Sequence, residues 1–320
     1  MAPVARFFVL VPLILALVSF VLTSLTLFAG NKQGFMEDYA VVRLNTSMIG
    51  RNLLDKAKDG GKDAGKSGSA KDGLLGDIKN WWDDAKGGAK DQINGIKGAA
   101  ADKLAGKLGV SQWYSLHIMD SCEGNWSPNA TALEPSLNVT NCTASSPSHR
   151  LNLTEMLDHE LKVGPLKLNL ADLDWPDSIQ DKLDVLNDAL MALFVVYVLA
   201  VGFSGLSMFL NLGAFLLPGK AGLVPLNLVV GTLGGLACII GTLIVAVAGP
   251  KGVREINDKG ARVGISAERG IKFYIVSCIA TGFMLGVAMF WLAQFLALRR
   301  KNKAEPSPGE KEEKEEKEAC

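Results

Sequence analysis

The stretch ALMALFVVYVLAVGFSGLSMFLNLGAFLL, residues 189–217, decides the fold of this 320-residue chain because it contains no Asp, Glu, Lys or Arg. A helix needs about 20 apolar residues to cross roughly 30 Å of membrane hydrocarbon. Three further runs share this property, at 7–29, 222–249 and 273–298. The first run exceeds the roughly 7–15 apolar residues of a signal peptide, so we expect an uncleaved span. The four runs predict an all-α membrane protein, a bundle of four transmembrane helices.

The N-glycosylation triplets of the chain all lie between the first and second runs. They begin at Asn45, Asn125, Asn129, Asn138, Asn141 and Asn152. Because glycans are added on the lumenal side, we expect the loop 30–188 to be extracellular. Four spans then place the termini, 1–6 and 299–320, in the cytoplasm, with a cytoplasmic turn at 218–221 and a second extracellular loop at 250–272.

The basic residues agree with this topology at one place and conflict with it at another. The tail begins with RRKNK, 299–303, as the positive-inside rule requires. The loop 250–272 carries six Lys and Arg residues although the topology places it outside. We keep the topology because the glycan triplets, the tail and the number of spans agree.

Within the large loop, residues 52–110 form an insert rich in Lys, Asp and Gly. Apolar residues recur there in steps of three and four, which is typical of one face of a helix. Two interpretations remain: a flexible, partly helical spacer, or an amphipathic helix on a membrane or partner, with Trp81 and Trp82 at the interface. The segment YAVVRLNTSMI, 39–49, is expected to be a strand or the start of a helix, and Trp175-Pro176-Asp177 resembles a helix start.

The segment 111–165 holds Cys122 and Cys142, the only cysteines of the large loop. The secretory path is oxidising, so we expect these two residues to form a disulfide. Closing a loop of about 20 residues stabilises a fold by roughly 3 kcal/mol in the chain-entropy account. Cys238 and Cys278 lie inside the runs and are expected to be packing residues.

No set of residues in the sequence predicts catalysis. The histidines, His117, His149 and His159, lack the spacing of a zinc hydrolase, so we expect no metal, no cofactor and no enzyme activity. Lys and Arg number 33, as do Asp and Glu, so the charge predicts no nucleic-acid partner. We also expect no small-molecule substrate.

Polar and small residues inside the runs predict helix packing rather than transport. The runs contain no charged residue of the kind that lines ion pathways. The amides of Asn211, Asn227 and Gln294 are expected to form hydrogen bonds between helices. Two GxxxG pairs permit close helix approach, either within the bundle or between copies. They are Gly231 with Gly235 and Gly282 with Gly286.

The segment WYSLHIMDSCEGNW, 113–126, followed by Cys142, resembles the first-loop signature of the fungal Sur-seven/PalI membrane proteins. The motif residues are Trp113, Tyr114, Cys122, Gly124 and Cys142. Three further segments agree in order along the chain: 41–49, 175–190 and 260–274. Claudin-like proteins share a related glycine and cysteine-pair arrangement, so the agreement of the other segments gives the resemblance its specificity.

The resemblance implies a four-span plasma-membrane protein of fungi. Sur-seven-type members associate with eisosomes and cortical domains, and affect wall organisation and endocytosis. PalI-type members assist ambient-pH signalling and usually carry a long cytoplasmic tail, so the short tail at 299–320 favours the Sur-seven type. A third alternative is a claudin-like protein of calcium uptake or cell fusion. The expected partners are membrane lipids, a second copy of the chain, or cortical and eisosome proteins.

Overall fold

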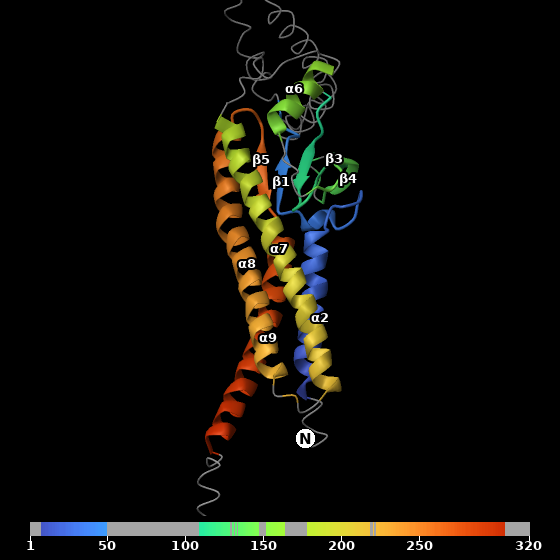
Figure 1. Cartoon of the computed structure of the whole chain (residues 1–320). Coiled ribbons are helices and arrows are strands. Elements are labelled where there is room, and N and C mark those ends of the chain that lie inside the picture. The colour runs from blue at the N-terminus through green and yellow to red at the C-terminus, as the bar shows by residue number, and fades with distance from the viewer. Residues whose placement is uncertain are drawn as a thin grey trace, which may run out of the picture. The chain divides into compact units, whose positions relative to one another are not determined.

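The computed structural model describes residues 8–49, 109–128, 130, 132, 134–146, 152–163, 178–217, 220 and 222–304 (Figure 1). The insert up to residue 108, Asn129, the segment 175–177 and the tail beyond 304 lie outside the described residues. The chain divides into two compact units. The bundle unit comprises 1–24, 196–241 and 277–320, and the sheet unit comprises 25–195 and 242–276.

Four helices are long and apolar enough to cross a membrane, as the four runs predict. They are α2 (Leu10–Leu27), α7 (Ser178–Leu216), α8 (Leu223–Gly260) and α9 (Ile271–Ala304). In the bundle unit, small side chains let the helices approach closely. One core cluster contains Ala200, Ala237, Cys238 and Met284, and another contains Ala16, Val287 and Trp291.

The prediction of an all-α protein is wrong for the sheet unit, which contains a five-stranded antiparallel sheet of order β4-β3-β2-β1-β5. Its strands are β1 (Val42–Asn45), β2 (Trp113–Leu116), β3 (Ser121–Ser127), β4 (Ser136–Cys142) and β5 (Ser266–Arg269). Most strands are short, and their partners are distant in sequence, so hydropathy along the chain did not reveal the sheet. The segment after the first span thus forms the strand Val42–Asn45 followed by a turn, rather than a helix start.

The segment predicted as the loop 250–272 is mostly regular structure. Helix α8 continues through Pro250, although an interior proline removes one backbone hydrogen bond. Tertiary contacts stabilise this extension: Ile256 is buried, and Asn257 exchanges two hydrogen bonds with the backbone of Ala267, at 3.1 and 2.5 Å. Strand β5 then pairs with β1, with Val42 opposite Arg269 and Asn45 opposite Ser266.

The second apolar run also lies in a longer helix than predicted. Helix α7 begins at Ser178, and its polar first turns bury Ile179, Leu183 and Leu186. A short helix, α6 (Leu153–Val163), lies against this segment, where the Thr154 hydroxyl donates to Gln180 Oε1 at 2.7 Å. The helix therefore combines an amphipathic start with an apolar span.

Candidate functional site: the disulfide-bonded sheet

The residues of the aromatic and cysteine motif meet across three neighbouring strands. Trp113 on β2 lies opposite Gly124 on β3, and Cys122 on β3 lies opposite Cys142 on β4. Trp113 and Tyr114 are 0% and 1% exposed. A Cβ atom at Gly124 would collide with the Asn138 carbonyl oxygen and the Trp113 ring, so only glycine lets this ring lie against the strand. The motif is therefore a packing unit.

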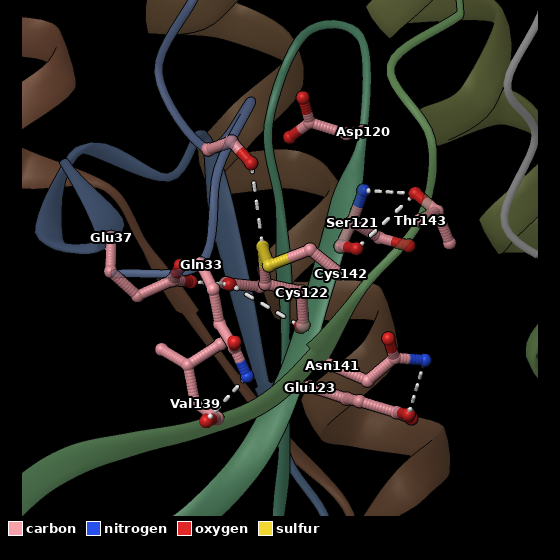
Figure 2. The surroundings of a disulfide bond; sticks show 12 residues. Gln33, Glu37, Asp120, Ser121, Cys122, Glu123, Val139, Asn141, Cys142 and Thr143 are labelled. Atoms are coloured by element: carbon pink, nitrogen blue, oxygen red, sulfur yellow. Dashed lines mark hydrogen bonds between the residues drawn. A yellow bond between two sulfur atoms is a disulfide. The ribbon is translucent and has the colours of Figure 1, made fainter. Parts of the chain in front are cut away.

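Cys122 and Cys142 form a disulfide with an S–S distance of 2.02 Å (Figure 2). Hydrogen bonds on both sides of the bond hold the two strands together. The Ser121 amide donates to Thr143 Oγ1 at 3.0 Å, and the Asn141 side chain donates to Glu123 Oε1 at 3.4 Å. Cys122 is buried, whereas Cys142 is half-buried.

Beside the disulfide lies a buried polar cluster that sequence reasoning missed. The Ser115 hydroxyl donates a short hydrogen bond to Glu37 Oε1, and His117 Nε2 lies 3.3 Å from the same oxygen. Glu37 and His117 are 7% and 2% exposed. Glu37 lies in a short 3-10 helix, Glu37–Tyr39, about 80 positions from His117, so no local pattern could have joined the two.

A second charged residue borders this cluster. Arg43 on β1 donates to the Glu37 carbonyl oxygen at 3.0 Å, and its guanidinium lies 5.9 Å from the Trp113 ring centroid. Burial lowers the pKa of Arg43, while the carboxylates of Asp38, Glu37 and Glu268 oppose that shift. The guanidinium thus joins the polar cluster to the aromatic motif.

Two groups of residues in the described part of the chain have the types and spacing of metal ligands. One contains Glu37, Cys122 and Cys142, and the other contains His117, Asp120 and Cys122. In each group the ligand atoms lie within 4.8 Å of one another. Both groups include Cys122, whose sulfur belongs to the disulfide. Histidine spacing in the sequence did not predict these groups, because their members come from segments that only the fold brings together.

The predicted glycan acceptors differ in accessibility. Asn125, Asn138, Asn141 and Asn152 are exposed, and Asn129 lies outside the described residues. Asn45 is half-buried in β1, its Oδ1 accepts from the Ser47 amide at 3.0 Å, and Thr46 and Ser47 are buried. Asn45 is therefore the least accessible of the acceptors that the structure describes. Glycosylation of all six remains a prediction.

In the bundle unit, the predicted glycine pairs have different surroundings. A Cβ atom at Gly231 would lie 3.5 Å from Val287, one at Gly235 would lie 3.6 Å from Leu285, and one at Gly286 would lie 3.2 Å from Leu15. Around Gly282, no described atom outside its own helix lies within 4 Å. The tightest positions, which sequence reasoning missed, are Gly234 against Met284 and Gly241 against Tyr197, at 2.6 and 2.8 Å.

Hydrogen bonds between the helices confirm the predicted role of two amides. Trp291 Nε1 donates to Asn211 Oδ1 at 2.7 Å, and Asn227 Nδ2 donates to the Leu210 carbonyl oxygen at 3.4 Å. Gln294 is exposed instead. Among the free cysteines of the described chain, Cys238 is buried in a core cluster, but Cys278 is exposed, so the packing prediction is wrong for Cys278.

These features define a class: a multi-pass membrane protein with four apolar helices and a disulfide-bonded antiparallel sheet. A family model described as the SUR7/PalI family matches residues 8–290. The chain belongs to this family, which confirms the resemblance seen in the motif. No curated protein and no solved structure matches the chain.

Proposed function

We propose that this chain is a non-enzymatic organiser of cortical domains in the fungal plasma membrane, associated with eisosomes, wall organisation and endocytosis. Membership of the SUR7/PalI family supports this role. In the proposal, the four helices associate laterally in the bilayer while a rigid, glycosylated sheet unit lies outside the cell.

The pairing of β1 with β5 is the structural observation that supports the membrane topology in this proposal. Strand β1 follows the first span and β5 precedes the fourth, so both segments must lie on one side of the membrane to share backbone hydrogen bonds. An open sheet edge cannot cross hydrocarbon without unsatisfied backbone groups. The pairing thus supports an extracellular position for 250–272, in agreement with the glycan triplets of the large loop.

Ion pairs join the large loop to the segment 250–272. Lys272 lies 2.5 Å from Asp38, and Lys182 of the large loop lies 3.5 Å from Glu255. The positive-inside rule counts basic residues and is little affected by acidic ones, so these pairs do not remove its conflict with the basic segment 250–272. The strand pairing and the glycan triplets, rather than charge, support the topology with both termini cytoplasmic.

Glycosidase digestion of single Asn→Gln variants tests the topology. We expect Asn138→Gln to remove one glycan-dependent mobility step, and Asn45→Gln to serve as the matched control with little change because Asn45 is half-buried. Absence of any glycosidase shift in the wild-type chain from a fungal host would refute the extracellular assignment.

A fluorescent fusion at the C-terminus tests the organiser role. We expect stable cortical patches in wild-type cells and altered wall or endocytic phenotypes on deletion. A surface signal spread evenly, with unaltered wall and endocytosis, would contradict the role. A defect confined to growth at alkaline pH would instead favour the PalI-type accessory function.

A further inference from the structure

The buried cluster beside the disulfide contains lone pairs that the described residues do not use. Glu37 Oε2 and His117 Nδ1 are buried and have no hydrogen-bond partner within the described chain. A buried polar atom left without a partner costs about 1–3 kcal/mol. Because His117 Nδ1 can offer a lone pair, a cation or a hydrogen-bond donor satisfies it, and a further acceptor does not.

The His117 ring is oriented as metal-binding histidines usually are. Its Nε2 lies 3.3 Å from a carboxylate oxygen of Glu37, which leaves the lone pair of Nδ1 for another partner. Histidines that bind metals commonly donate their second nitrogen to a carboxylate, which fixes the tautomer and the ring orientation. Glu37 is thus a positioning residue for His117.

Sulfur and oxygen donors surround this ring. Ligand atoms of His117, Asp120 and Cys122 lie within 4.8 Å of one another. Cys142 belongs to the neighbouring group with Glu37 and Cys122, and its sulfur is bonded to that of Cys122. The Ser145 hydroxyl donates to Asp120 Oδ2 at 2.7 Å and orients that carboxylate. Two thiolates, one imidazole and one carboxylate form a donor set that suits tetrahedral Zn²⁺.

The backbone, rather than the disulfide alone, keeps the two cysteines together. Cys122 and Cys142 are direct partners in the β3–β4 register, with Cα atoms 4.1 Å apart. The strands remain hydrogen-bonded along this ladder from Ser127 and Ser136 to the cysteines. Reduction therefore leaves the Cys122 thiol beside His117 and Asp120, with Cys142 opposite Cys122 on β4.

We propose that reduction of the Cys122–Cys142 disulfide converts this cluster into a Zn²⁺ site formed by Cys122, Cys142, His117 and Asp120. A thiol reductant supplies two electrons: the S–S bond breaks, two protein thiols form, and two reductant thiols become a disulfide. Zn²⁺ then binds the two sulfurs as thiolates and releases two protons. The oxidised chain cannot form the site because both sulfurs are bonded to each other.

A groove of about 490 Å³ lies beside Glu37, and Gly34, Trp126 and Val139 contribute to its lining. Glu37 is the one member of the cluster that lines this groove in the described part of the chain. This inference does not depend on the proposed cortical function.

The test uses the full-length chain in detergent. Serine replaces Cys238, Cys278 and Cys320, so that Cys122 and Cys142 are the only cysteines able to bind the ion. The chain is titrated with Zn²⁺ and with Co²⁺, first oxidised and then after treatment with a phosphine reductant. We expect one ion per reduced chain and none per oxidised chain. We also expect sulfur-to-cobalt charge-transfer and tetrahedral ligand-field bands in the reduced form only.

Variants separate ligands from positioning residues. His117→Ala is expected to raise the Kd for Zn²⁺ about 100-fold or more, and Glu37→Gln about 10-fold with shifted cobalt bands. His159→Ala is the matched control because His159 is exposed on α6, and it should bind as the parent does. Equal binding by the oxidised and reduced parent, no binding by the reduced parent, or unchanged binding in His117→Ala would each overturn the proposal. The oxidised-versus-reduced comparison needs no variant of the cluster, so it decides even if His117→Ala fails to fold.

Discussion

The sheet unit and the bundle unit use apolar residues in opposite ways. In the sheet unit, the largest side chains are the most deeply buried: Trp113, Tyr114 and Leu44 are at most 1% exposed. In the bundle unit, Phe209 and Met289 are 65% and 64% exposed on helices that are long and apolar enough to cross a membrane. The sheet unit therefore buries its largest aromatic residues, whereas the bundle unit exposes many large apolar residues beside a few buried ones such as Trp291 and Met284.

This difference follows from the solvent that each unit meets. Water drives large apolar side chains into the sheet core, at about 25 cal/mol per Å² of buried surface. Lipid gives no such drive, so helices associate through small residues and hydrogen bonds. Gly234 against Met284 and Trp291 with Asn211 are contacts of this second kind. We therefore expect loss of a buried side chain to lower the stability of the sheet unit more than loss of a helix-helix hydrogen bond lowers that of the bundle unit.

The largest expected effect is that of Trp113→Ala, because it removes a fully buried aromatic ring from the sheet core. Large-to-small aromatic substitutions in cores cost about 3–5 kcal/mol. The measurement is limited proteolysis of the purified chain, scored by cleavage within the sheet unit. Trp126→Ala is the control, since Trp126 is half-buried, and a smaller increase in cleavage is expected. Equal effects of the two variants would show that burial does not set the stability of the sheet.

The double variant Cys122→Ser, Cys142→Ser should come next, with a loss of about 3 kcal/mol, because the unfolded chain regains the entropy of an open loop. Thermal unfolding followed by loss of the folded sheet signal measures this change. Cys278→Ser is the matched control because that cysteine is free and exposed. If both variants melted at the same temperature, the disulfide would have no role in the stability of the sheet unit.

Gly264→Ala should destabilise the sheet unit by about 2 kcal/mol or more. Gly264 has φ +83°, and a Cβ atom there would collide with the Met48 carbonyl. Gly34→Ala separates backbone strain from collision, because Gly34 has φ +76° with no described atom within 4 Å. For Gly34→Ala, only the roughly 1–2 kcal/mol of a left-handed backbone is expected. Matching unfolding midpoints for the two variants would remove the steric explanation.

The smallest effect is expected in the bundle unit, from Asn211→Leu. This change leaves Trp291 Nε1 without its acceptor, and hydrogen bonds between membrane helices contribute about 0.6–2 kcal/mol. Unfolding by sodium dodecyl sulfate, followed by circular dichroism, measures the loss. Gln294→Leu is the control because Gln294 is exposed. A loss from Asn211→Leu as large as that from Trp113→Ala would break the distinction between the two units.

Some features of the site could be predicted from the sequence, and others could not. The disulfide followed from compartment and cysteine count, because only two cysteines share the large loop. The Glu37–His117 cluster did not, because its members come from segments about 80 residues apart and meet only when β1 and β2 pair. Likewise, Cys278 and Cys238 both lie inside apolar runs, but Cys278 is exposed and Cys238 is buried.

The sequence by itself determined the four apolar helices and the motif of the SUR7/PalI family, because both depend on residue types at short spacing. Only the tertiary structure decided that the loops after the first span and before the fourth form one sheet. Strand pairing joins residues more than 200 positions apart, such as Val42 and Arg269, and no local periodicity encodes such a partner. A second pairing, of β1 with β2, brings Glu37 close to His117 beside the disulfide. The two groups of possible metal ligands lie there.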